Sequence, residues 1–379
     1  MWSFIRRTTA AGALTLSVGL GVGVPASAAV TGSAPQSSAP SAQPTAAQAG
    51  AGWLGRQFHG AFIGTKSTPD PGSTAEAVLA FAAAGAGGTK ARAAITWLTK
   101  HFESYVSPGG VDDAGALATV ILAAQVMGGR AAGVDPTAFG GRKAANDLVA
   151  RLELTQRTSG SDAGLFGASD PSFDGAFRQG LSLMALVNQG LGGSAAVAAG
   201  VTWLQNQQCA DGGWESYRSD LTTACPVPDP STFSGPDTNS TALAVEGLVA
   251  AGGTFPTSPL AFFESSQNTD GGFGFIGAAS QSPDPDSTGL VIQALVALGQ
   301  QNNAAFTQTG GATPFTALAT FQLGCSATKA QRGAYTFPGE SGPNLLATLQ
   351  AVPGAAGVAF PLTAQSIPPA LPTLKCPAH

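Results

Sequence analysis

The sequence "WLQNQQCADGGWESY", from Trp203 to Tyr217, joins an aromatic residue and three glutamines to a diglycine turn and a second tryptophan. The sequence "FFESSQNTDGGFGF", from Phe262 to Phe275, repeats this order with phenylalanine in place of tryptophan. Two stretches that share an aromatic residue, a glutamine and a diglycine indicate an internal repeat, and a period of this length is typical of repeat architectures.

The same anchor occurs six times along the chain, as an aromatic residue or leucine followed four residues later by glutamine or histidine. The six pairs are Trp53/Gln57, Trp97/His101, Leu152/Gln156, Trp203/Gln207, Phe263/Gln267 and Leu318/Gln322. A spacing of four places both side chains on one face of a helix. Each anchor is therefore expected to lie near the end of an amphipathic outer helix.

A second helix is expected after each glycine-rich turn, because Ala/Leu/Val-rich stretches follow the turns and stop at glycine. Examples are "STAEAVLAFAAAG" (73–85), "STALAVEGLVAAG" (240–252) and "STGLVIQALVALG" (287–299). Helices that are apolar nearly all round are buried on most sides. No alternating strand pattern of any length is visible. An open array of helix pairs would need polar repeats at its ends, and no such end repeat is obvious, whereas a closed ring needs none. The sequence therefore predicts an all-α fold, an (α/α)6 toroid of six helix-pair repeats closed into a ring.

The stretch from Ala199 to Trp214 resembles the QW motif of squalene and oxidosqualene cyclases, and the repeats are similar to those of protein prenyltransferase β subunits. The resemblance extends from about Trp53 to Gly354 and is strongest in the fourth and fifth units. It implies a toroid in which the glutamine bridges to a neighbouring helix while the aromatic residue packs over it. Gln207 with Trp214, and Gln267 with Phe273, are the pairs that would clamp one unit to the next.

The ends of the chain differ in composition from the repeats. Residues 1–28 have a basic start, a short apolar stretch and a small-residue site after Ala28, which predicts a cleaved signal peptide and a secreted protein. Residues 29–50 are rich in Ala, Ser, Pro and Gln and are expected to be a disordered leader. The toroid is assigned to 51–360 and a C-terminal tail to 361–379. No later stretch is apolar enough to span a membrane.

Charge and cysteine content limit the partners. Without Arg6 and Arg7 the chain has 15 basic and 22 acidic residues, a net charge of −7, and it has no basic stripe for nucleic acid. Four cysteines in an exported chain favour two disulfides, Cys209 with Cys225 and Cys325 with Cys376. We expect a monomer without a cofactor. We also expect no metal, because the zinc-binding Asp-x-Cys of the prenyltransferases has no counterpart here.

Three acidic motifs stand at the starts of the predicted inner helices: "DPGST" at Asp70, "DTNST" at Asp237 and "DPDST" at Asp284. Asp284 and Asp286 match part of the Asp-x-Asp-Asp acid motif of class II terpene cyclases. Capping is the favoured interpretation, because Asp, Ser and Thr accept the free N–H groups of a first helical turn. A carboxylate held there is expected to have a lowered pKa, unlike a catalytic acid.

The functional prediction is a secreted binding protein with a central, largely apolar pocket, which takes a small apolar or amphipathic ligand or an extracellular partner. Its predicted ligand-binding residues are Asp70, Asp237, Asn239, Glu246, Asp284 and Asp286. The alternative is a terpene-cyclase-like enzyme, or another lyase or hydrolase, with Asp284 and Asp286 as the catalytic pair. Glu76, Asp112, Asp113 and Asp174 are further carboxylates that a hydrolase of this shape could use.

Overall fold

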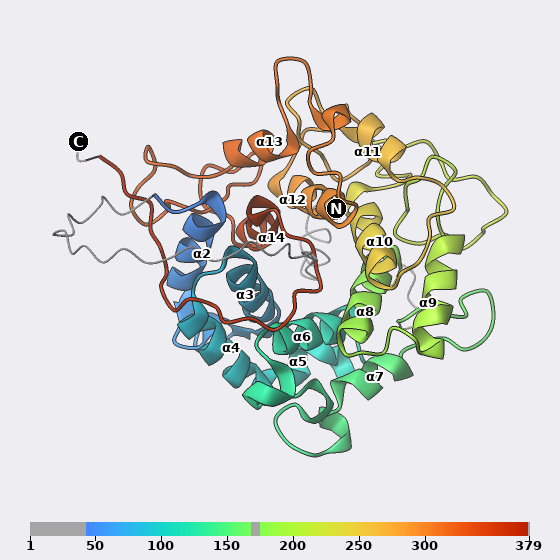
Figure 1. Cartoon of the computed structure of the whole chain (residues 1–379), viewed down its shortest axis with the longest axis horizontal. Coiled ribbons are helices and arrows are strands. Elements are labelled where there is room, and N and C mark those ends of the chain that lie inside the picture. The colour runs from blue at the N-terminus through green and yellow to red at the C-terminus, as the bar shows by residue number, and fades with distance from the viewer. Residues whose placement is uncertain (1–42, 168–174, 378–379) are drawn as a thin grey trace, which may run out of the picture.

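The computed structural model of the chain describes residues 43–167 and 175–377 (Figure 1). The predicted cleavage site after Ala28, most of the leader and Asp174 lie outside these ranges. Residues 46–50, predicted as disordered leader, instead belong to helix α2 (Ala46–Arg56). Thr45 caps this helix, and Gln48 completes a capping box with it, so a polar Ala/Gln stretch becomes a regular first turn.

The described chain is mostly helical, and its helices form two layers (Figure 1). Each predicted anchor lies in or just after an outer helix. The outer helices are α2, α4 (Gly88–His101), α7 (Leu148–Leu154), α9 (Ala195–Asn206), α11 (Leu260–Ser266) and α13 (Pro314–Thr320). The inner helices are α3 (Pro71–Ala84), α6 (Ala114–Val126), α8 (Ala176–Asn188), α10 (Thr238–Ala250), α12 (Pro285–Ala297) and α14 (Leu345–Ala356).

The inner helices close a ring. Each packs against the next in the order α3, α6, α8, α10, α12, α14, and α14 packs back against α3. Nearly every residue of α6 is buried, as its apolar composition predicts. This two-layered ring is the α/α toroid that the sequence predicts, and none of the helices in the described part of the chain is long and apolar enough to cross a membrane.

Short elements that the sequence did not predict occur in the connections. Three antiparallel strands in the order β1, β2, β3 join α2 to α3, and strands of two or three residues are too short to produce an alternating pattern. They are β1 (Phe58–His59), β2 (Phe62–Gly64) and β3 (Pro69–Asp70). The other short elements are α5 (Glu103–Val106) and 3-10 turns at Pro108–Gly110, Gly129–Ala132, Pro136–Ala138, Ala144–Asn146 and Ala304–Phe306.

One hydrogen bond recurs between an inner helix and the connection before it. Four residues after the cap, a threonine Oγ1 accepts the backbone N–H of a residue in the turn, at 2.9–3.0 Å. The pairs are Thr74 with Ile63, Thr241 with Trp214, Thr288 with Phe273 and Thr348 with Tyr335. In α8 the Oε1 of Gln179 accepts from Phe166 in the same way. This face of these five inner helices is therefore turned toward the connection before each of them.

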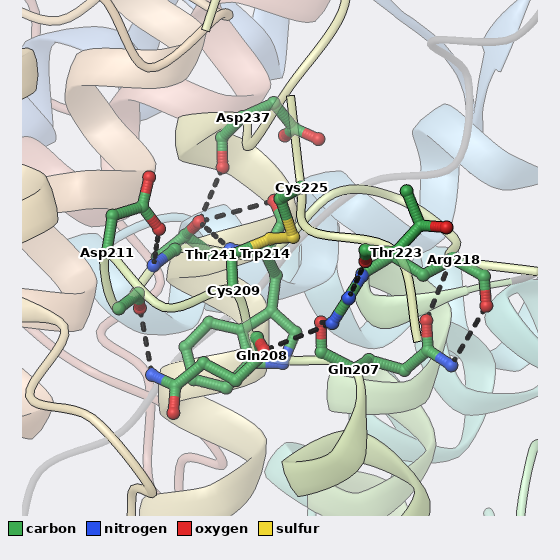
Figure 2. The surroundings of a disulfide bond; sticks show 12 residues. Gln207, Gln208, Cys209, Asp211, Trp214, Arg218, Thr223, Cys225, Asp237 and Thr241 are labelled. Carbon is green, nitrogen blue, oxygen red and sulfur yellow. Dashed lines mark hydrogen bonds between the residues drawn. A yellow bond between two sulfur atoms is a disulfide. The ribbon is translucent and has the colours of Figure 1, made fainter. Parts of the chain in front are cut away.

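The glutamine bridge between units is present, but its residue in the fourth unit is Gln208, not Gln207. Gln208 Nε2 donates to Gly212 O at 2.9 Å (Figure 2) and to Thr257 O, ahead of α11, at 2.7 Å. Gln207 instead bonds the backbone of Arg218 in its own unit. The four-residue spacing misled the prediction because the residue after Gln207 is also a glutamine.

Three other glutamines bridge units as expected. The Nε2 atoms of Gln156, Gln267 and Gln322 each donate to a carbonyl in their own turn and to one ahead of, or at the start of, the next outer helix. The bond from Gln322 reaches Ala46 O at 2.8 Å and closes the outer layer. Gln57 does not bridge, because it donates to Trp53 O of its own helix. His101 stacks on Trp97 at 4.5 Å between ring centroids.

The anchor aromatic residues differ in burial. Trp53, Trp203, Trp214, Phe263 and Phe273 are buried, whereas Trp97 is half-buried. The indole N–H of Trp214 donates to Leu204 O at 2.8 Å, so this side chain ties the turn to the end of α9. The aromatic residues therefore fill the space between a turn and the outer helix before it.

The C-terminal strap, residues 358–377, crosses the end of the ring where the inner helices stop. Asn188 Nδ2 donates to Leu362 O, and Gln365 bonds Val126 O and Ala82 O. These contacts lie at the last turns of α8, α6 and α3. Both predicted disulfides are confirmed, and Cys325–Cys376 holds the strap to the sixth unit. The strap therefore covers part of one opening of the ring.

Candidate functional site

The other opening, which we call the entry face, is where the inner helices begin. Asp70, Asp237 and Asp284 cap α3, α10 and α12, and each Oδ1 accepts the N–H of the serine three residues later, at 2.6–2.9 Å. Capping, the favoured interpretation of the three motifs, is therefore confirmed for these residues. They remain on separate helices, and Asp70 is exposed while Asp237 and Asp284 are buried.

The expected pKa of the two buried caps is wrong in direction. Burial raises the pKa of Asp237 to about 7 and that of Asp284 to about 6, although the hydrogen bonds from Ser240 and Ser287 act in the opposite sense. A helix N-terminus stabilises a carboxylate, but removing the carboxylate from water disfavours it more strongly here. The sequence does not show how deeply a helix start is buried. Figure 2 shows Asp237 beside Thr241 and the Trp214 turn.

Asp286 is not a helix cap. It is the second residue of α12 and is half-buried, and its Oδ1 is buried with no hydrogen-bond partner in the described part of the chain. Burial, and then the nearby Asp284 and Glu340 carboxylates, hold the pKa of Asp286 well above its usual range. The structure thus brings together Asp284 and Asp286, the two residues that the alternative prediction paired, and raises the pKa of Asp286.

The face of each inner helix that looks toward the ring axis follows from helix geometry. With about 100° of rotation per residue, positions two, six and nine after the cap lie opposite the threonine position, which bonds the connection. We call this set the axial stripe. It contains the polar residues Glu76, Thr119, Asn239, Glu246, Asp286, Gln293 and Gln350, the apolar residues Leu79, Leu122, Phe177, Leu181, Met184, Leu243, Leu290 and Leu346, and Gly72, Gly115 and Pro353. A pocket along the ring axis would therefore have a mixed lining, in place of the largely apolar lining that the sequence predicted.

Glu246 is the most deeply buried carboxyl group of the stripe. The side chain is fully buried, and both of its oxygens lack a hydrogen-bond partner among the described residues. Burial raises the pKa of Glu246 well above its usual range. Burial thus favours the protonated form of Glu246, and a protonated carboxyl group can donate one hydrogen bond.

Tyr105 is a site residue that the sequence did not single out. Its ring lies against Gly72 in the first turn of α3, where a methyl group would approach Tyr105 Cε2 to 2.8 Å. Burial and the Glu76 carboxylate raise the pKa of Tyr105, so its hydroxyl stays protonated beside the stripe. A glycine two residues after a capping aspartate was the available signal, because it leaves room for a neighbouring side chain.

The stapled loop contains a further group of metal-ligand residue types. Cys209, Glu215 and Cys225 place one ligand atom each within 4.8 Å of one another. The two sulfur atoms are joined in a disulfide and cannot act as thiolate ligands. This group is therefore a structural staple of the fourth connection.

Comparison with known proteins supports the fold. No protein-family model matches the sequence, and no curated protein matches it. A solved structure of UGL with dGlcA-Glc-Rha-Glc is 12% identical, with a TM-score of 0.54, and the match covers 82% of this chain and 95% of that chain. This likeness shows a shared α/α toroid fold.

Two further solved structures match with lower TM-scores. The structure of Candida albicans protein geranylgeranyltransferase-I complexed with GGPP matches with a TM-score of 0.48 at 9% identity. The match covers 74% of this chain and 82% of that chain. A protein from Actinoplanes gives 0.45 at 16% identity, covering 82% and 98%.

Proposed function

We propose that this protein is a secreted ring of six helix-pair repeats that binds a small amphipathic ligand through its entry face. The observation that carries this proposal is the axial stripe, where carboxyl groups with raised pKa and amide groups lie among leucine and phenylalanine residues along the inner helices. Binding sites for small molecules typically combine an apolar wall with a few convergent polar groups. The two disulfides agree with an oxidising, extracellular environment.

Access to the ring favours the entry face. The C-terminal strap crosses the opposite opening, at the ends of α3, α6 and α8. All six large apolar side chains that are well exposed among the described residues lie at the ends of outer helices or in the connections to inner helices. They are Val111, Leu154, Leu221, Val227, Phe233 and Phe275. Exposed apolar groups gathered at one end support contact with an apolar ligand or partner there.

The protonation states of the stripe indicate the chemistry of the ligand. Asp286 and Glu246 have raised pKa values and present hydroxyl donors, whereas the buried caps Asp237 and Asp284 would repel an anion once they ionise. A neutral ligand with an apolar body and an oxygen acceptor fits this combination best. An isoprenoid alcohol such as farnesol is a suitable probe.

Titration of the protein with farnesol, followed by calorimetry, tests the proposal. Phe177→Asp puts a charge on a half-buried position of the stripe and is expected to weaken binding at least tenfold. Ala198→Asp puts the same charge on an exposed face of α9, away from the stripe, and is expected to leave the affinity unchanged. Equal affinities of both variants and the wild type, or no binding at all, would contradict a farnesol-type site at the stripe.

A second candidate function is acid catalysis, favoured by the raised pKa and unpartnered Oδ1 of Asp286. A protonated carboxyl group near Asp284 is a possible proton donor to an alkene or a glycosidic oxygen. Incubation of the wild-type protein with squalene distinguishes this function from binding alone. Cyclised product that disappears in Asp286→Asn, but persists in the exposed-turn control Asp270→Asn, would establish an enzyme. Under the binding proposal no product forms.

A further inference from the structure

A pocket of about 550 Å³ lies where the first and last units of the ring meet. The end of α2 contributes Trp53, Arg56 and Gln57 to its wall, and the sixth connection and the start of α14 contribute Ala330, Gln331 and Leu345. We call it the seam pocket. It is separate from the axial stripe, because none of its lining residues belongs to the stripe, and its volume suits a small molecule.

The polar groups of the seam pocket are mainly donors. Arg56 is held in place by bonds from Nη1 to Gly52 O at 3.0 Å and from Nη2 to Arg332 O at 2.8 Å. Gln331 Oε1 already accepts from Thr328, which leaves the Nε2 amide of Gln331 as its free polar end. Gln57 uses one amide hydrogen on Trp53 O. The remaining hydrogens of these side chains can point to a bound acceptor.

The charge of the seam pocket is not balanced by a nearby acid. No ion pair to Arg56 occurs within the described residues, although three other arginines, Arg130, Arg151 and Arg178, are paired with carboxylates. Partial burial lowers the pKa of the Arg56 guanidinium, which remains charged at physiological pH. A partly desolvated guanidinium with a fixed orientation is a strong site for a carboxylate.

We propose that the seam pocket binds a small carboxylate with an apolar tail. The carboxylate accepts hydrogen bonds from Arg56 and Gln331, and the tail lies against Trp53 and Leu345. Trp53 is buried, and Leu345 is half-buried, so the apolar wall is continuous with the core of the seam. The pattern of the repeats explains the position of the site, because Gln57 does not bridge to a neighbouring unit and its amide is left at the pocket.

Octanoate, with octanol and octylamine as matched probes, tests the proposal by calorimetry on the full chain. Octanoate is expected to bind with a Kd on the order of 0.1–1 mM, since a ligand of this size gains only a few kcal/mol. Octanol and octylamine are expected to bind at least tenfold more weakly. Equal affinity for octanoate and octanol would overturn the proposal.

Two variants locate the site. Arg56→Met is expected to weaken octanoate at least tenfold, whereas Arg92→Met, on an exposed face of α4, is expected to have no effect. Ala330→Phe fills the pocket from an exposed turn without removing a hydrogen bond, and it keeps the test valid if Arg56→Met does not fold. Octanoate binding that survives Ala330→Phe would refute the assignment. Farnesol binding at the stripe is expected to be unchanged in Ala330→Phe, so the two sites fail independently.

Discussion

A carboxyl group at a buried helix start is subject to two opposed effects. The first-turn N–H groups favour its charged form, as the bond from Ser240 N to Asp237 at 2.6 Å shows. The loss of water favours its neutral form, and for Asp237 this loss is the larger effect, with a resulting pKa of about 7. The residue type at a cap therefore does not by itself determine whether the cap is charged.

Asp237 is expected to make the protein less stable as the pH rises. Its carboxyl group keeps its proton to about pH 7 in the folded state, whereas the unfolded chain loses it near pH 4, so unfolding becomes easier between these values. In Asp237→Asn the cap is retained and this dependence is removed. Urea unfolding measures the free energy of unfolding of Asp237→Asn minus that of the wild type. This difference should be higher at pH 8 than at pH 4, by up to roughly 4 kcal/mol.

The exposed cap Asp70 provides the control for this pH dependence. Asp70→Asn leaves a similar hydrogen-bonding side chain at the start of α3, but the wild-type carboxyl group there is in contact with water. The difference in unfolding free energy between Asp70→Asn and the wild type should change little from pH 4 to pH 8. A pH dependence of the same size in both variants would contradict the role assigned to burial.

At the scale of helices, close contacts between inner helices are made through glycine. Gly180 of α8 lies against Leu243 O of α10. A Cβ atom added to Gly247 of α10 would lie 2.6 Å from Gly180 Cα. Gly289 of α12 and Gly354 of α14 repeat this arrangement. The inner helices can therefore approach backbone to backbone at two of their contacts.

Gly180→Ala is expected to destabilise the protein strongly, because its methyl group would overlap the backbone of α10. Overpacking of a core costs about 1–3 kcal/mol and more where backbone must move. Gly193→Ala, in a turn where an added Cβ meets nothing within 4 Å, is the matched control and should be neutral within about 0.5 kcal/mol. Thermal unfolding of the two variants measures the difference, and similar melting temperatures would show that α8 and α10 can separate without cost.

The sequence predicts the elements better than their side-chain roles. The outer and inner helices follow from local composition and period, because each helix buries an apolar surface that the sequence displays. The choice of Gln208 over Gln207, and the position of Tyr105 beside Glu76, depend on how a turn folds back on its neighbours. Asp286 shows the same limit, since the burial of its Oδ1 without a hydrogen-bond partner among the described residues is a property of the assembled ring.

At the scale of the whole molecule, the C-terminal strap links parts of the ring that are far apart in sequence. Gly87 N and Gly88 N donate to Ala370 O and Pro368 O at 2.8 Å, and the Cys325–Cys376 bond joins residues 51 positions apart. In the chain-entropy model a loop of this length contributes about 4 kcal/mol, compared with about 3 kcal/mol for Cys209–Cys225. The strap is therefore expected both to cover one end of the ring and to stabilise the folded protein.

Removal of the strap disulfide tests this expectation. The double variant Cys325→Ser/Cys376→Ser should unfold about 4 kcal/mol more easily, and amide exchange at Gly87 and Gly88 should increase because both amides are bonded to the strap. In Cys209→Ser/Cys225→Ser the loss should be smaller and the exchange at these two glycines unchanged. Unaltered exchange in the first variant would mean that the strap is held without its disulfide.

The bond from Gln322 to Ala46 has a topological consequence. Gln322 bonds the start of the first outer helix as Gln156, Gln208 and Gln267 bond the segments at or before the next outer helices, so the ring has no physical beginning. Gln43 and Lys375 also exchange hydrogen bonds, at 2.6 and 3.1 Å, and the two ends of the folded body lie side by side. A short linker could join these ends, and the chain could be reopened at the exposed turn near Gly193. Such a circular permutant should fold to the same ring, since every unit would keep both neighbours.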